Sequence, residues 1–224
     1  MIPWQHLDSA TVPGDGGELR LMRRGTEYSI MAGGIELMNS RLSGSEEALA
    51  TLAFDRIGGR PKARVLIGGL GMGFTLRAAL GAFGNDAEIV VAELVPGVIA
   101  WARGPLGELY GDSLSDPRAA LHEGDVGALI GANEAVWDAI LLDVDNGPGG
   151  LSRKENDGLY SSAGLATAWR ALRPGGVLEV WSSTRDTAFT NRLKRAGYGV
   201  EEIGVRAHKG RGARHVIWMA TKVG

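Results

Sequence analysis

The stretch Val-Leu-Ile-Gly-Gly-Leu-Gly-Met-Gly, residues 65–73, decides the fold class. Its apolar first half is typical of a buried strand, and its glycines are typical of a tight turn from a strand into a helix. Such glycines let the main chain approach a ligand closely, and the N–H groups that open the following helix favour a carboxylate or a phosphate. The stretch therefore predicts a nucleotide site, with a purely structural turn as the alternative.

The spacing of Gly69, Gly71 and Gly73 separates two kinds of nucleotide site. The dinucleotide fingerprint G-x-G-x-x-G requires a glycine where this chain has Phe74. The spacing G-x-G-x-G is instead the one found in methyltransferases. We therefore favour a nucleotide of the S-adenosylmethionine type over NAD, and Met72 belongs to this loop.

Strand and helix patterns alternate from Arg64 onward, which predicts βαβ units around a buried parallel sheet. Only the short Gly- and Ala-rich segment 207–213 separates the last two strands, so these should pair antiparallel. We expect an α/β, Rossmann-like class I methyltransferase fold with a seven-stranded, mostly parallel sheet that ends in this antiparallel pair. The predicted strands are 64–68, 88–93, 119–123, 137–143, 176–181, 200–205 and 214–220, and the predicted helices are 74–83, 96–103, 126–131, 159–172 and 186–196.

The first sixty residues have a different pattern. Segments 18–22, 27–31 and 35–38 are short and separated by Gly-rich turns, which predicts a small antiparallel β-hairpin layer followed by a helix over 45–57. We therefore expect a hairpin layer with its helix over residues 1–60 and a nucleotide-binding, Rossmann-like catalytic domain over 61–224.

Composition excludes several classes of protein. The formal charge of -2 provides no broad basic field for nucleic acid, and no apolar run approaches the roughly 20 residues of a membrane-spanning helix. The first ten residues lack the pattern of a secretory signal, and the chain has no cysteine for disulfides or a thiolate site. We expect a cytoplasmic protein that acts on a small molecule, without a nucleic-acid or membrane partner.

Two acids follow the predicted strands next to the glycine loop. Glu93 ends its strand, where an acid can accept hydrogen bonds from ribose hydroxyls, and Leu94 beside it belongs to the same predicted site. Asp125 could accept from an adenine amino group, with Val126 supplying a main-chain N–H and apolar contact. The alternatives are a solvated strand end for Glu93 and a helix cap for Asp125.

Asp143 is the best catalytic candidate, because ligands of open α/β sheets lie beyond the carboxyl ends of the strands. Its carboxylate could orient or deprotonate an attacking amine. Asp145 could join it, since two like charges raise one pKa or bind a cation. Alternatively, Asp145 and Asn146 only shape a Gly-Pro turn. The four histidines show no spacing typical of a metal site.

Charged residues at two further places have open interpretations. Glu46 and Glu47 begin the helix after the hairpin layer, where acids suit the helix dipole without further purpose. If the hairpin layer covers the crevice, Glu47 would add negative charge beside Asp143 and favour a cationic substrate. A basic cluster near the end is either a solvated loop or a site for an anionic group, and it comprises Arg206, His208, Lys209, Arg211, Arg214 and His215.

Taken together, these residues resemble the spermidine synthase family, the aminopropyltransferase branch of the class I methyltransferase fold, from about Leu19 to Ser182. The hairpin layer, the glycine loop with Leu76-Arg77 and the acids follow the order of that family. The resemblance implies that Glu93 holds the ribose, Asp125 the adenine and Asp143 the attacking amine. It also places Tyr28, Glu47 and Asn146 on the substrate side, and it suggests a homodimer.

Four departures from the family pattern limit what can be carried over. Met72 stands where the family has the Asp of G-G-G-D-G-G, and Asn146 stands where it has the second acid of D-S-S-D-P. Tyr28 or Glu27 occupies the place of a glutamine, and Ser-Glu-Glu at 45–47 replaces Tyr-His-Glu.

The first departure bears on the donor. An acid at position 72 would repel the carboxylate of S-adenosylmethionine and tolerate the decarboxylated form, and charges about 4 Å apart interact by about 4 kcal/mol at an effective dielectric of about 20. Because Met72 removes this repulsion, we expect methyl transfer from S-adenosylmethionine to a small acceptor such as an amine, which Asp143 positions or deprotonates. Aminopropyl transfer from decarboxylated S-adenosylmethionine to a polyamine is the alternative. A second alternative is a non-catalytic nucleotide-binding module.

Overall fold

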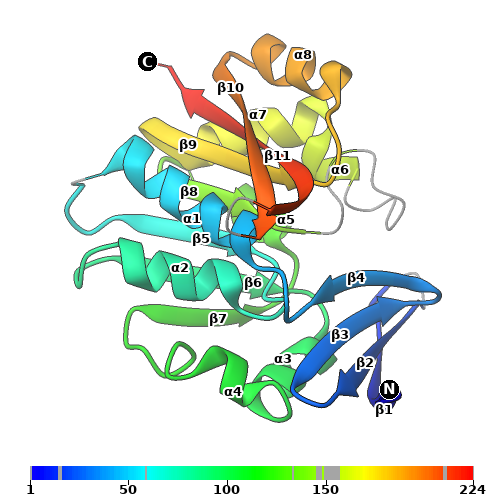
Figure 1. Ribbon diagram of the computed structural model, residues 1–224. Coiled ribbons are helices and arrows are strands. Elements are labelled where there is room, and N and C mark those ends of the chain that lie inside the picture. Colours follow the sequence, from blue (N-terminus) through cyan, green and yellow to red (C-terminus); the bar gives the residue numbers. More distant parts are fainter. Residues whose placement is uncertain are drawn as a thin grey trace.

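The computed structural model describes residues 2–14, 17–58, 60–132, 134–144, 148, 157–208 and 211–223. Two sheets organise the described chain (Figure 1). The small sheet, which is the hairpin layer, contains β1 (Gln5–Thr11), β2 (Glu18–Arg24), β3 (Glu27–Ala32) and β4 (Ile35–Asn39) in that order. The large sheet contains β5 (Arg64–Gly68), β6 (Glu88–Glu93), β7 (Ala119–Glu123), β8 (Trp137–Leu142), β9 (Leu172–Ser182), β10 (Tyr198–His208) and β11 (Arg211–Lys222).

The strand order of the large sheet is β10-β11-β9-β8-β5-β6-β7. Strand β11 runs antiparallel to both β9 and β10, and the pairings among β9, β8, β5, β6 and β7 are parallel. This confirms the predicted fold class. Arg206 pairs with Arg214 in the antiparallel ladder, so Arg206 lies in a strand and not in the expected loop, whereas Arg214 lies in a strand as predicted.

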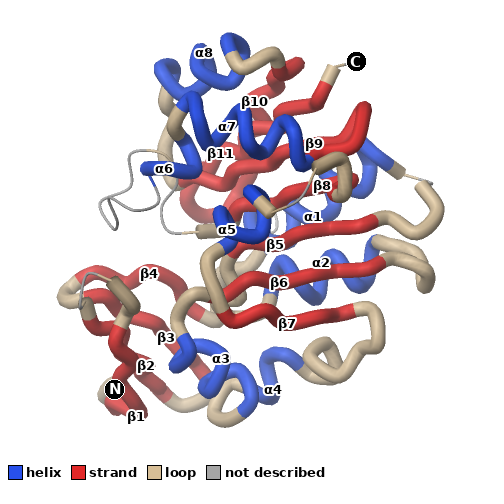
Figure 2. Tube along the Cα trace, turned by 180° about the vertical axis from the view of Figure 1, so that it is seen from behind, coloured by secondary structure: helices blue, strands red, loops and turns tan. Residues whose placement is uncertain are grey.

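Helices cover both faces of the large sheet (Figures 1 and 2). Val65 and Ile67 of β5 face one apolar core and Leu66 faces the other, as expected for parallel strands that are buried on both sides. Helices α1 (Gly44–Ile57), α2 (Phe74–Ala82), α3 (Pro96–Arg103) and α4 (Gly107–Tyr110) contribute to the first core, and α5 (Val126–Gly131), α6 (Asp157–Tyr160), α7 (Ser162–Ala171) and α8 (Thr187–Arg195) contribute to the second. In the described part of the chain, no helix is long and apolar enough to cross a membrane.

Strand β1 was not predicted because its sequence lacks apolar alternation. Of its residues only Ala10 is buried. The strand is held by polar and close contacts instead: Trp101 of α3 donates from Nε1 to Asp8 Oδ2 at 2.7 Å, and Gly97 of α3 packs so tightly on Ala10 that a Cβ at position 97 would lie 2.3 Å from the Ala10 Cβ. These contacts attach the hairpin layer to the main domain.

The helix expected over 159–172 is interrupted. Ser161 has an extended main chain, and its Oγ accepts a hydrogen bond from the Gly164 N–H at 3.0 Å, which caps α7 and separates it from α6. An N-cap serine in this position starts a new helix. The strand that follows begins at Leu172, four residues earlier than predicted at 176.

The carboxyl ends of three parallel strands lie side by side. Gly68 at the end of β5 faces Ala92 of β6 on one side and Leu142 of β8 on the other. The residues that come next, Gly69, Glu93 and Asp143, therefore meet at one edge of the sheet.

Glu179 is a buried acid in the middle of β9, between Leu141 of β8 and Met219 of β11. Its side chain is fully buried, and neither carboxylate oxygen has a hydrogen-bond partner within the described residues. Burial raises the pKa of Glu179 well above its ordinary value of 4.5, and the positive charge of Arg56 opposes this only in part. The folded protein therefore keeps Glu179 protonated to higher pH than the unfolded chain does.

Replacing Glu179 by methionine should stabilise the protein. Because the pKa is raised in the folded state, the free energy of unfolding of the wild type falls as pH rises above the ordinary glutamate value. Glu179→Met removes both the unpaired buried carboxyl group and the decrease in stability that comes with its ionisation. We therefore expect the free energy of unfolding to rise by about 1–3 kcal/mol near pH 8. Urea denaturation near pH 8 and near pH 4 measures it, and the gain should be smaller at the lower pH.

The matched control is Glu123→Met, since Glu123 is an exposed strand residue. It should change the free energy of unfolding by less than about 0.5 kcal/mol. A loss of stability in Glu179→Met near pH 8 would show that the buried carboxylate is needed for the fold.

Candidate active site

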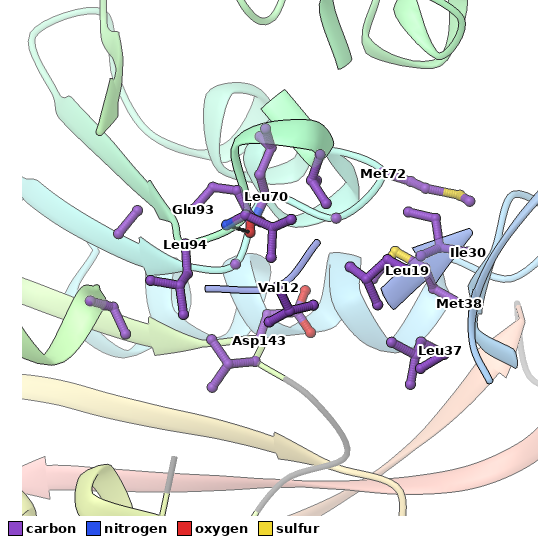
Figure 3. A pocket seen from close by; sticks show the side chains of 18 of the residues that line it. Val12, Leu19, Ile30, Leu37, Met38, Leu70, Met72, Glu93, Leu94 and Asp143 are labelled. Carbon is purple, nitrogen blue, oxygen red and sulfur yellow. Dashed lines mark hydrogen bonds between the residues drawn. The ribbon is translucent and has the colours of Figure 1, made fainter. Parts of the chain in front are cut away.

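A cavity of about 320 Å³ lies between the hairpin layer and the carboxyl ends of β5, β6 and β8. This volume is at the lower end of the range for small-molecule sites. Figure 3 shows apolar side chains of the hairpin layer gathered on one side of the cavity, with Glu93 and Leu94 on the other. The hairpin layer contributes Leu19, Ile30, Leu37 and Met38 to this apolar wall, and its Val12 also lines the cavity.

The glycine loop forms one end of the cavity. Gly69, Gly71 and Gly73 have φ angles of 92°, 52° and 77°, a region that only glycine adopts readily. A Cβ at Gly69 would lie 2.4 Å from the main-chain oxygen of Asp143, and a Cβ at Gly73 would lie 2.4 Å from the Tyr110 ring. Gly69 and Gly71 line the cavity, whereas Gly73 is the N-cap of α2. The loop is thus fixed both by its own conformation and by packing.

Glu93 is buried behind this loop. Its carboxylate accepts hydrogen bonds from the main-chain N–H groups of Leu70 and Val95, each at 2.9 Å. Burial raises the pKa of Glu93, and these main-chain donors oppose the rise. Each carboxylate oxygen has a further lone pair, so hydroxyl groups of a ribose could donate to it from the cavity. Leu94 lines the cavity next to it.

Asp125 and Val126 line the cavity beyond β7. Asp125 is exposed, and its Oδ1 accepts the Ala128 N–H at 2.8 Å as the N-cap of α5, which is the alternative role that the sequence allowed. Val126 is buried against the second core. The cap uses Oδ1, so a role for Asp125 in holding an adenine stays a prediction.

Asp143 lies directly after β8, at the floor of the cavity. Its main-chain N–H donates to Gly68 O at 3.0 Å, which holds it next to the glycine loop, and Thr75 Oγ1 donates to its Oδ2 at 2.7 Å. Burial and the nearby charge of Glu46 raise the pKa of Asp143 to about 7, against the effect of the Thr75 hydrogen bond. A carboxyl group with this pKa can both accept and release a proton near neutral pH.

Two of the predicted substrate residues are placed differently from Asp143. The described residues around the cavity include Glu46 but not Glu47 or Tyr28. Tyr28 is buried in the core of the hairpin layer. The predicted residues Asp145 and Asn146 lie outside the described residues, so their roles stay predictions.

Helix periodicity explains why Glu46, and not Glu47, lines the cavity. The buried face of α1 contains Leu49, Ala50 and Ala53, and residue 46 lies three and four positions before the first two of these. Residue 47 lies four positions before Thr51, which is exposed. Burial raises the pKa of Glu46, although Ser45 donates a hydrogen bond to it. Sequence reasoning recorded both acids, but it did not use this period to separate them.

Comparison with known proteins adds a family resemblance in sequence. No family model matches the chain. The polyamine aminopropyltransferase of Nitrosomonas europaea is 35% identical over 122 residues, which are 54% of this chain and 35% of that protein. Curated relatives from other bacteria have the same name. The chain spans less than half the length of these relatives.

Solved structures show the same architecture over nearly the whole chain. The spermidine synthase of Thermotoga maritima matches with a TM-score of 0.74 at 17% identity, covering 97% of this chain and 72% of that one. A spermidine synthase in complex with the transition-state analogue AdoDATO matches with a TM-score of 0.75 at 18% identity and the same coverage. The chain has the spermidine synthase-like form of the class I methyltransferase fold, which confirms the predicted resemblance.

These findings overturn methyl transfer as the leading interpretation. The curated relatives are named aminopropyltransferases and the structural neighbours are spermidine synthases, so the alternative reading is the better supported one. The physical reason lies in Met72, on which the prediction depended. It lines the cavity, but its side chain is 1% exposed and packs in the apolar core. Met72 therefore removes a repulsion of the S-adenosylmethionine carboxylate but supplies no group that attracts that carboxylate.

The requirement for glycine at position 69 can be tested by substitution. Gly69→Ala should lower the free energy of unfolding by at least about 1–2 kcal/mol, because alanine is strained at this φ and its Cβ would collide with the Asp143 carbonyl. Affinity for 5′-methylthioadenosine, the nucleoside part of the predicted ligand, should fall with it. Urea denaturation and titration calorimetry measure the two effects.

Gly81→Ala in α2 is the control. A Cβ there meets no heavy atom within 4 Å, and alanine is the better helix former, so stability should rise by about 0.5–1 kcal/mol with nucleoside affinity unchanged. If Gly69→Ala bound the nucleoside as the wild type does, the loop would not be its binding site.

Proposed function

We propose that this chain is an aminopropyltransferase that moves the aminopropyl group of decarboxylated S-adenosylmethionine to a small amine. The observation that carries the proposal is the Asp143 carboxylate, which lies at the glycine loop in a covered cavity with its pKa raised to about 7. The names of the relatives and the fold support the same class of reaction.

The donor nucleoside fits the part of the cavity around the carboxyl ends of β5 and β6. Gly69 and Gly71 let the main chain approach it closely. Glu93 would accept hydrogen bonds from the ribose hydroxyls, with both of its oxygens already oriented by main-chain donors. Asp125 and Val126 would hold the adenine from the next strand end, where both line the same cavity.

The reaction requires a neutral amine next to the aminopropyl carbon that is bonded to the donor sulfur, on the side of that carbon opposite the sulfur. The amine nitrogen forms a bond to the aminopropyl carbon attached to the sulfonium as the carbon–sulfur bond breaks. The electron pair of the broken bond stays on sulfur and gives methylthioadenosine, and the nitrogen loses one proton. Asp143 can accept that proton directly or hold the amine in line for attack.

The acceptor side of the cavity suits an alkyl amine. Leu19, Ile30, Leu37 and Met38 form the apolar wall, and Glu46 and Asp143 line the same cavity. Methylene groups pack on the apolar wall while an ammonium or amine group reaches the acids. This combination supports a small aliphatic amine as the acceptor class.

Asp143 should set the pH dependence of the reaction. Because a carboxylate accepts a proton only when ionised, kcat/KM with putrescine should rise as pH increases through about 7. Asp143→Asn should lower kcat/KM by about 100-fold or more and remove this rise, with methylthioadenosine binding retained. Release of methylthioadenosine, followed by chromatography, measures the rate.

Asp112→Asn is the control, since Asp112 is exposed and does not line the cavity. It should keep the rate and pH profile of the wild type. Equal turnover in Asp143→Asn would remove Asp143 from the mechanism. Absence of methylthioadenosine formation by the wild type with any small aliphatic amine would contradict the proposed activity.

A further inference from the structure

Glu46 is a second acid in the cavity, and no sequence prediction assigned it a role there. It lines the cavity together with Asp143, and its charge contributes to the raised pKa of that residue. Thr75 connects the two: its Oγ1 lies 2.7 Å from Asp143 Oδ2 and 3.3 Å from the main-chain oxygen of Glu46. The first turn of α1 and the end of β8 are therefore held at a fixed separation.

A chain of hydrogen bonds that passes through the buried Ser45 orients the Glu46 carboxylate. Ser45 Oγ donates to Glu46 Oε2 at 2.6 Å, and His215 Nδ1 lies 2.9 Å from Ser45 Oγ. Ser45 is fully buried, and the His215 ring packs edge-to-face on Trp181 with 4.8 Å between ring centroids. Since Ser45 has a single proton and gives it to the carboxylate, the imidazole donates from Nδ1–H.

We propose that Glu46 and Asp143 together bind one ammonium or amine group of the acceptor, and that Ser45 and His215 are positioning residues that hold Glu46 toward the cavity. This inference rests on the proposed function, because it assigns the acceptor end of that site. The charge of Glu46 acts on Asp143 and raises its pKa, so the two carboxylates repel each other, and a cation between them relieves the repulsion. Of the other acids that line the cavity, Glu93 and Asp125 lie at the proposed nucleoside end and Glu18 is exposed, so Glu46 and Asp143 form the pair that we assign to the acceptor nitrogen.

Neighbouring Glu46 and Glu47 provide a matched pair of variants. Glu46→Gln removes one charge of the proposed pair, whereas Glu47→Gln removes the same charge from a residue that does not line the cavity. Binding of putrescine is measured by titration calorimetry in the presence of saturating methylthioadenosine, so that no turnover takes place. Glu46→Gln should raise Kd about tenfold or more, and Glu47→Gln should change it by less than about twofold.

The positioning role needs a variant that keeps the hydrogen bond. In His215→Asn the side-chain amide N–H occupies roughly the place of imidazole Nδ1 and can still donate to Ser45 Oγ. His215→Ala should weaken putrescine binding, whereas His215→Asn should retain most of it. A merely structural role for the ring would make the two variants equally defective, since both lose the Trp181 contact.

The outcomes separate the two proposals. Thermal unfolding of each variant shows whether it folds, and Glu46→Gln should be at least as stable as the wild type because it removes a repulsion. If the wild type binds putrescine and Glu46→Gln binds it equally well, the carboxylate pair is overturned and the aminopropyltransferase proposal stands. If the wild type binds methylthioadenosine but no putrescine, the assigned acceptor class is wrong and the pair is overturned with it.

Discussion

The in-register ending of three parallel strands is the constraint on which the rest of the site depends. Gly68 faces Ala92 and Leu142, and main-chain hydrogen bonds extend this register by one residue, from Gly69 N to Ala92 O and from Asp143 N to Gly68 O. A tight turn, the acid proposed to bind the ribose and the acid proposed to act in catalysis, from segments far apart in the sequence, are thereby brought to one edge. A shift of one residue in either pairing would turn Glu93 or Asp143 to the opposite face of the sheet.

The hairpin layer converts this edge into a covered cavity. It is attached through the Trp101–Asp8 hydrogen bond and the close packing of Gly97 on Ala10, and it places an apolar wall opposite the acids. Withdrawal from water is what raises the pKa values of Glu93 and Asp143. The chemistry proposed for Asp143 therefore depends on a layer that contributes no catalytic group of its own. Strand β1, which sequence patterns did not reveal, is part of that attachment.

The predictions from sequence were most accurate for the elements whose bounds are set by the local sequence pattern. Strands β5, β6 and β7 begin and end at the predicted residues, because their apolar runs are bounded by turns and their ends are fixed by the sheet. The polar strand β1 was missed because tertiary contacts hold it in place. The break at Ser161 was missed because it depends on a single helix cap. In the site, Asp143 could be found from its place after a strand, whereas Tyr28 and Glu47 were chosen by resemblance. The helix period of α1 pointed to Glu46, and only the packing of the hairpin layer makes that acid part of the cavity.

Three acids with raised pKa values illustrate how stability and function diverge in this fold. Within the described residues the Glu179 carboxylate has no hydrogen-bond partner, and Glu179 does not line the cavity, so its burial destabilises the fold without contributing to the site. Glu46 and Asp143 also keep raised pKa values through burial and mutual repulsion, but they face a cavity that a ligand can enter. A cation that binds there removes the repulsion, so part of the free energy lost in folding returns as affinity. Position relative to the cavity, and not burial alone, distinguishes an acid that can bind a ligand from an acid that only destabilises the fold.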